Sequence, residues 1–131
     1  MTQKSHNTQR IAVFPGSFDP FTIGHLSVVE RGLQLFDKVI VAIGYNEHKT
    51  TAAGIEERLQ RIREAFGKDA AVEVDCYSGL TVDYARRKGA RFILRGARTY
   101  TDFEYERNLA DVNRKISGIE TVILFTLPEH A

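Results

Sequence analysis

A chain of 131 residues suits one domain with one hydrophobic core, and 43% hydrophobic with 27% charged residues argues against global disorder. Eighteen basic residues against seventeen acidic ones give a formal net charge of +1, which excludes a protein that binds nucleic acid through bulk positive charge. The single cysteine, Cys76, excludes an intrachain disulfide and, with only four histidines, a cysteine-rich zinc site.

Residues 1–10 are polar and lack the apolar stretch of a secretory signal, so they predict a flexible tail on a cytoplasmic protein, followed by one domain over residues 11–131. No apolar run approaches the roughly 20 residues of a membrane span, and no membrane partner is expected. After the tail, short apolar runs alternate with segments of helical spacing. Strands are predicted at 11–14, 39–43, 72–76, 92–94 and 121–127, and helices at 24–36, 55–66, 80–88 and 101–116.

The last of these helices carries two local signals. Thr101 and Glu104 have the spacing of a capping box, in which each side chain bonds the backbone N–H of the other, so the helix is predicted to begin there. Helical spacing predicts a buried apolar stripe behind it, formed by Tyr105, Leu109, Val112 and Ile116.

Strands that alternate with helices predict an α/β fold: a single Rossmann-like domain with a parallel five-stranded sheet and helices on both faces. Crossovers in such a sheet are right-handed. Ligands bind beyond the carboxyl ends of the strands, at the point where the strand order switches. The loops at 15–24, 44–54 and 95–101 follow strands in this way, and the chemistry is expected there.

The first of these loops has the composition of an anion site. Gly16 and Gly24 let the backbone pass close to a ligand, and the helix that starts near Gly24 presents unpaired N–H groups. Ser17 adds a hydroxyl, and His25 on the first helical turn could aim an imidazole N–H at the same anion. The loop lacks the lysine and the spacing of a Walker A motif. The alternative is a plain strand-to-helix turn in which His25 caps the helix.

The third loop is basic: six cations and no carboxylate lie between residues 86 and 98. The three at 86–88 sit at a helix end and favour a solvated terminus. Arg95 and Arg98 flank a glycine after a buried strand, and a guanidinium matches phosphate geometry bidentately. The alternative for both arginines is a structural salt bridge to Asp102 or Glu106.

Two motifs together resemble a known family. G-S-F-D-P-F-T-I-G-H over residues 16–25 resembles the (H/T)-x-G-H signature of the nucleotidyltransferase superfamily, with Thr22 and His25 on the motif positions. R-G-x-R-x-x-x-D-F-E-Y-E-x-x-x-A-x-x-N, matched over residues 95–113, resembles the phosphopantetheine adenylyltransferase family in particular. The resemblance covers most of residues 11–127. Serine at position 17 departs from the commoner threonine but keeps the hydroxyl.

The resemblance implies transfer of an adenylyl group from ATP to 4′-phosphopantetheine, giving dephospho-CoA and pyrophosphate in the penultimate step of coenzyme A synthesis. The substrate phosphate would attack in line, without a covalent enzyme intermediate. The family also implies Mg²⁺ held mainly by the ATP phosphates rather than by a protein metal site, a homohexamer, and dephospho-CoA or CoA as product or feedback ligand.

The resemblance also assigns residues to roles. The catalytic set is Ser17, His25, Lys49 and Arg98. The ATP-binding set is Ser17, Phe18, His25, Arg95, Gly96, Arg98 and Glu106. The substrate-binding set is Ser17, Lys49, Leu80, Arg95 and Asn113. Helical spacing puts Glu106, Ala110 and Asn113 on one stripe, which suits a ligand groove, and Tyr105 is a core residue by spacing but lies beside the site by motif.

One departure from the family leaves alternatives open. Family members continue with a Ser-rich turn that helps hold the ATP phosphates and with a further helix, and the printed sequence stops before both. Either an existing C-terminal segment is omitted from this sequence or the chain is truncated, and a truncated chain is expected to bind ATP poorly. The alternatives are another nucleotidyltransferase, using CTP or a different acceptor, and a nucleotide-binding module without turnover.

Overall fold

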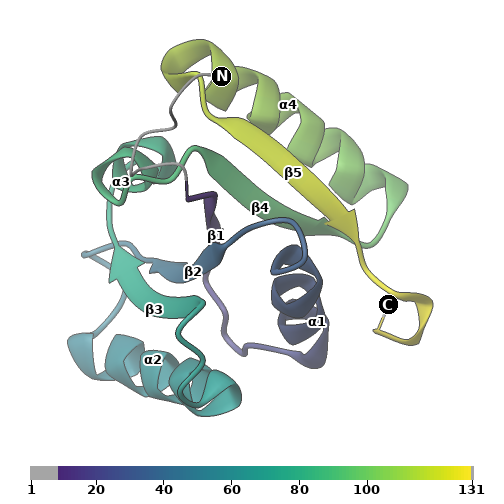
Figure 1. Cartoon of the computed structure of the whole chain (residues 1–131). Helices are drawn as coiled ribbons and strands as arrows, with labels where there is room; N and C mark the ends of the chain where they lie inside the picture. The colour runs from purple at the N-terminus through teal and green to yellow at the C-terminus, as the bar shows by residue number, and fades with distance from the viewer. Residues whose placement is uncertain (1–8, 131) are drawn as a thin grey trace.

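A computed structural model of the chain describes residues 9–130 (Figure 1). Strands and helices alternate as predicted. Their bounds are β1 (Ile11–Gly16), α1 (Ile23–Gly32), β2 (Lys38–Gly44), α2 (Ala52–Phe66), β3 (Val72–Tyr77), α3 (Thr81–Arg87), β4 (Phe92–Ala97), α4 (Tyr100–Ser117), β5 (Glu120–Phe125) and a 3-10 turn at Pro128–His130. None of the described helices combines the length and the apolarity that a membrane crossing needs.

Most of the predicted N-terminal tail, residues 1–8, lies outside the described part of the chain. Arg10, its last residue, is held in place. The Arg10 N–H donates to Asp37 at 2.7 Å, and its carbonyl accepts from the N–H groups of Asp37 and Lys38. Arg10 is therefore hydrogen-bonded to the segment that leads into β2.

The five strands are parallel and lie in the order β3-β2-β1-β4-β5, so the direction of winding reverses between β1 and β4. Strands β1 and β2 pair over six positions, but β1 and β4 pair only through Ala12↔Phe92 and Val13↔Ile93. The carboxyl ends of β1 and β4 therefore separate. This opening is the switch point where ligands bind in sheets of this kind.

Helices cover both faces of the sheet, as predicted (Figure 1). Helices α1 and α2 pack on one face, around a core that includes Val29, Leu59 and Leu94. Helix α3 packs on the other face against Ile40 and Ile93, and α4 lies on that same face against β4 and β5. Helix α1 ends at Gly32, earlier than predicted, and a Cβ there would come within 2.7 Å of Leu94.

The predicted start of the last helix is wrong by two residues. Helix α4 is capped by Thr99, whose hydroxyl accepts from the Asp102 N–H at 3.1 Å. The Asp102 carboxylate accepts in turn from the N–H groups of Thr99 and Arg98, at 3.3 and 3.1 Å. An earlier start satisfies both of these donors, whereas a start at Thr101 would leave them free.

The predicted core stripe of α4 is also wrong, because it faces outward. Tyr105, Leu109, Val112 and Ile116 are 63, 37, 53 and 56% exposed. The inward stripe is instead the one that carries Glu106, which is buried, with Ala110 and Asn113 half-buried. Apolar periodicity identified the helix, but the face toward the sheet is polar because it holds an arginine and lines a cavity.

Candidate active site

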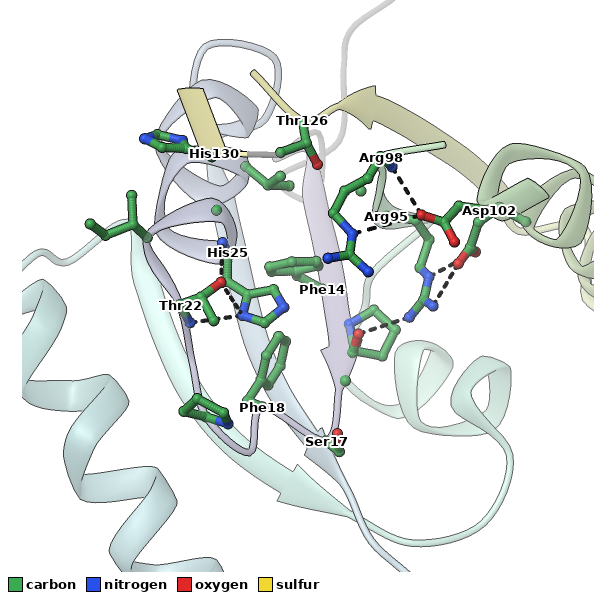
Figure 2. A pocket seen from close by; sticks show the side chains of 18 of the residues that line it. Phe14, Ser17, Phe18, Thr22, His25, Arg95, Arg98, Asp102, Thr126 and His130 are labelled. Carbon is green, nitrogen blue, oxygen red and sulfur yellow. Dashed lines mark hydrogen bonds and ion pairs between the residues drawn. The ribbon is translucent and has the colours of Figure 1, made fainter. Parts of the chain in front are cut away.

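A cavity of about 1010 Å³ lies at the carboxyl ends of β1 and β4, beside the start of α1 and the first turns of α4 (Figure 2). This is the site that strand alternation predicts. The cavity brings together residues from loops about 80 positions apart in the sequence. The predicted residues that line it are Ser17, Phe18, His25, Arg95, Gly96, Arg98 and Glu106.

His25 has one ring nitrogen committed to capping α1. Its Nδ1 accepts the backbone N–H of Thr22 at 2.9 Å, while the Thr22 hydroxyl accepts the His25 N–H at 3.3 Å. The capping alternative is therefore correct for Nδ1. Because an accepting Nδ1 carries no proton, the neutral ring has its proton on Nε2. Capping thus leaves Nε2–H as a hydrogen-bond donor for a ligand.

The surroundings of His25 keep the ring neutral. Burial among Phe14, Phe18 and Phe21, whose ring centroids lie 5.0–6.2 Å away, lowers the pKa of His25, and the positive charges of Arg98 and then Arg95 lower this pKa further. A neutral donor is suited to charge that develops on a phosphate oxygen, because it needs no change of protonation at neutral pH.

The lowered pKa of His25 predicts a pH effect on stability. In the unfolded chain His25 has its ordinary pKa of about 6.5, and in the folded chain its pKa is lower. Between these two values the unfolded chain binds a proton at His25 and the folded chain does not, so the free energy of unfolding decreases as the pH falls through this range. Melting temperatures measured from about pH 7.5 to 5.5 should fall more steeply for the wild-type chain than for His25→Asn. Parallel curves would contradict this assignment.

Phe18 shapes the turn after β1. Its φ of 48° lies in the left-handed region, and its ring is buried over Gly16, where a Cβ would come within 2.8 Å of the ring. Gly16 therefore has a specific role here: the absence of a side chain makes room for the Phe18 ring. The sequence had predicted only that this glycine lets the backbone pass close to a ligand. This packing places Ser17 at the mouth of the cavity.

Arg95 is held by the protein itself. Its Nε and Nη2 donate to the two carboxylate oxygens of Glu106 at 2.8 and 2.7 Å, and its Nη1 donates to the Pro15 carbonyl at 2.9 Å. The salt-bridge alternative is therefore correct for Arg95. Three of the five N–H donors of Arg95 are therefore used within the protein. The carboxylate of the buried Glu106 largely neutralises its positive charge. The same bonds tie β4 to β1 and α4 where the sheet opens.

Arg98 differs from Arg95 in having no close carboxylate partner. Its nearest one, Asp102, lies 3.8 Å from Nε, and the Arg98 side chain is 66% exposed. The same Asp102 oxygen already accepts two backbone N–H groups. The guanidinium reaches over the cavity (Figure 2). Arg98 is therefore the cation that can turn its planar fork to a phosphate without breaking a strong ion pair.

A second cavity of about 280 Å³ adjoins the first, between the sheet, α3 and α4. The predicted stripe of Glu106, Ala110 and Asn113 lines it. Tyr105 borders both cavities. This confirms the prediction from the motif that Tyr105 lies beside the site, and the prediction from helical spacing that it is a core residue is wrong. The Thr121 hydroxyl is buried without a protein partner in the described residues and also borders this space. The groove therefore combines apolar walls with side chains that can form hydrogen bonds, such as those of Asn113 and Thr121.

Two predicted residues lie outside both cavities. Lys49 is exposed and lines a third hollow of about 620 Å³, which shares Ser17 with the main cavity. Leu80 is 60% exposed and precedes α3, and none of the three cavities includes it. Its neighbour Thr81 lines the second cavity with Tyr77, whose hydroxyl lies 2.7 Å from that of Thr81. Tyr77 and Thr81 were not among the site residues predicted from the sequence.

Comparison with known proteins agrees with the geometry. The family described as cytidylyltransferase-like matches residues 13–130. Phosphopantetheine adenylyltransferases from Phocaeicola vulgatus and Bacteroides fragilis are 56% and 53% identical to this chain over 120 residues, which is 92% of this chain and 80% of each relative.

Solved structures agree in fold. A bifunctional NMN adenylyltransferase/ADP ribose pyrophosphatase from Francisella tularensis has a TM-score of 0.62 at 22% identity, over 88% of this chain and 38% of that chain. A lipopolysaccharide core biosynthesis protein from Thermoplasma volcanium has a TM-score of 0.60 at 19% identity, over 91% of this chain and 97% of that chain. With the nucleotidyltransferase motifs on the two sides of the switch-point cavity, this chain belongs to the phosphopantetheine adenylyltransferase family.

Proposed function

We propose that the two adjoining cavities carry out the reaction of the family, transfer of an adenylyl group from ATP to 4′-phosphopantetheine. The observation that carries this proposal is the shared wall of the cavities, formed by Pro15, Gly16, Arg95, Tyr105 and Glu106. Triphosphate chemistry would take place in the main cavity, and the amide-bearing arm would extend into the second one. The product, dephospho-CoA, would then occupy both, as would CoA acting as a feedback ligand.

The reaction needs no nucleophile from the protein. An oxygen of the acceptor phosphate forms a bond to the α-phosphorus of ATP, and the bond between that phosphorus and the oxygen bridging to the β-phosphorus breaks, so pyrophosphate leaves. The protein then has to position two polyanions and to stabilise the charge of the transition state. Ser17 and Lys49 would orient the attacking phosphate, Arg98 would bind the ATP phosphates, and the Nε2–H of His25 would donate to an α-phosphate oxygen.

The metal enters this proposal as part of the substrate, MgATP. Two of the carboxylates that line the main cavity already have partners: Asp102 accepts two backbone N–H groups, and Glu106 accepts the guanidinium of Arg95. Mg²⁺ coordinated by the phosphate oxygens of ATP leaves these bonds intact. Activity measured across a magnesium titration tests this arrangement.

Assembly into a cytoplasmic homohexamer is proposed from the family resemblance. The exposed stripe of Tyr105, Leu109, Val112 and Ile116 supports self-association, because α4 leaves these apolar side chains uncovered in a single chain. Light scattering on Ile116→Lys tests it, with Leu35→Lys as the matched control, since Leu35 is 47% exposed but lies outside the stripe. A hexamer that survives both changes would exclude this stripe as the contact.

Product analysis tests the proposed activity directly. The chain is incubated with ATP or CTP, each with 4′-phosphopantetheine, nicotinamide mononucleotide or glycerol phosphate, and products are identified by mass spectrometry with pyrophosphate release in parallel. The proposal expects dephospho-CoA from ATP and 4′-phosphopantetheine alone. Turnover with another pair would assign a different nucleotidyltransferase reaction. Nucleotide binding without any product would assign a non-catalytic module.

Asn113→Ala is expected to weaken 4′-phosphopantetheine binding while leaving ATP binding nearly unchanged. An amide of the acceptor buried in the second cavity would lose a partner, which costs about 1–3 kcal/mol, or roughly 5- to 150-fold in affinity. Calorimetric titration with each ligand separately measures both effects. Asn108→Ala is the control, because Asn108 lies exposed on the same helix and lines neither cavity. Equal losses for both ligands would contradict the division of the site.

A further inference from the structure

We propose that Arg58 of α2 is a positioning residue for the reaction, because it fixes the peptide unit between Ser17 and Phe18. Its Nη1 donates to the Ser17 carbonyl oxygen at 2.8 Å, a contact between residues 41 positions apart. Its Nε lies 3.4 Å from the Gly54 carbonyl oxygen, one turn earlier on the same helix. Arg58 is half-buried, and no carboxylate among the described residues lies within ion-pairing distance of it.

The Ser17–Phe18 peptide has little other support on this side. Gly16 ends β1 and pairs with Ile43, and the Phe18 ring is buried against Gly16, Phe14 and His25. These contacts hold the two ends of the short segment but not the rotation of the peptide between them. Within the described residues, the carbonyl of this peptide is bonded by Arg58.

Rotation of this peptide determines what the cavity presents to a phosphate. In a trans peptide the carbonyl and the following N–H point in opposite directions. A Ser17 carbonyl held toward α2 therefore directs the Phe18 N–H away from α2, and that N–H forms no backbone hydrogen bond elsewhere in the described residues. It also fixes the backbone from which the Ser17 hydroxyl projects. Arg58 thus acts through Ser17 and Phe18. It also lines the third hollow beside Lys49 and Ser17, so the test has to separate positioning from direct attraction of the substrate.

The inference rests on the proposed function, so the wild-type chain must first form dephospho-CoA from ATP and 4′-phosphopantetheine. Arg58→Met keeps the aliphatic stem and removes the donor. It is expected to lower kcat at least fivefold with KM for either substrate changed less than twofold, because ground-state binding uses other groups. Arg63→Met is the matched control: Arg63 is exposed on the same helix, lies 3.7 Å from Glu56 and lines none of the three cavities.

Arg58→Lys and an amide signal separate positioning from folding and from general charge. Lysine retains a single donor, so kcat should recover in part. With selective ¹⁵N-phenylalanine labelling, the Phe18 amide signal should shift in Arg58→Met and stay in place in Arg63→Met. The inference is overturned if the wild type is active and both methionine variants have the same kcat. It is also overturned if the Phe18 amide signal does not move in Arg58→Met. A rise in KM alone, fully restored by lysine, would assign Arg58 to substrate attraction instead and overturns it as well. A wild type without turnover overturns the proposed function itself.

Discussion

His25→Asn is expected to lower kcat by roughly 10²- to 10³-fold, or about 3–4 kcal/mol in transition-state free energy, with little change in melting temperature. The asparagine Oδ1 can take the place of Nδ1 and keep accepting the Thr22 N–H, so the cap on α1 survives. What is lost is the Nε2–H donor, whose value is greatest when charge develops on the α-phosphate. Steady-state kinetics and thermal unfolding on the same preparation measure both quantities.

His25→Ala is the companion variant, because it removes the cap as well as the donor. Its kcat should fall as far as that of the asparagine variant, while its folding stability should fall by about 1 kcal/mol more, the usual cost of a lost helix cap. If His25→Asn keeps near-normal turnover, His25 is a structural cap only and the proposed role for its Nε2–H is wrong.

Arg98→Lys is expected to lower turnover with ATP at least tenfold, or about 1.4 kcal/mol. Lysine keeps the positive charge but loses the planar fork that binds two phosphate oxygens at once. Arg98 suits this test better than Arg95, since a change at Arg95 would also strand the buried Glu106 carboxylate and destabilise the fold. Arg98 has only a weak ion pair to lose, because Asp102 lies 3.8 Å from its Nε. A loss of turnover in Arg98→Lys therefore reports on phosphate binding.

Arg86→Lys serves as the control for charge. Arg86 lies at the end of α3, where its guanidinium donates to the Ser117 carbonyl at 3.0 Å, and it lines none of the three cavities. Its replacement should leave turnover unchanged. Comparable losses at positions 86 and 98 would point to a general electrostatic field and would remove the case for a phosphate clamp at Arg98.

The order of strands and helices was predictable from the sequence, because short-range periodicity and turn residues determine it. The continuous apolar run at 39–43 forms β2 with both faces covered, and α2 ends at Phe66, the predicted end of that helix. The two motifs likewise identified the loops that carry Ser17, His25 and Arg98, since a ligand-binding loop follows its strand directly in the chain.

Only the tertiary structure decided which of these side chains bond to the protein itself and which remain free to contact a ligand. Whether Arg95 or Arg98 remains available to a phosphate depends on Glu106 and Pro15, which lie 11 and 80 positions from Arg95 in the sequence. The role of Arg58 depends in the same way on a carbonyl 41 positions away. Local propensity contains no information about such partners, which are brought together by the strand order and the packing of helices on the sheet.

The face of α4 shows the same limit. Its strongest apolar stripe points outward, and the polar stripe of Glu106 and Asn113 points inward. Burial normally favours the apolar face, but here the inward face must match the charge of Arg95 and line a cavity. The sequence alone determined that residues 101–116 would lie in an amphipathic helix, and the packing of that helix against β4 and β5 decided which side faces the site.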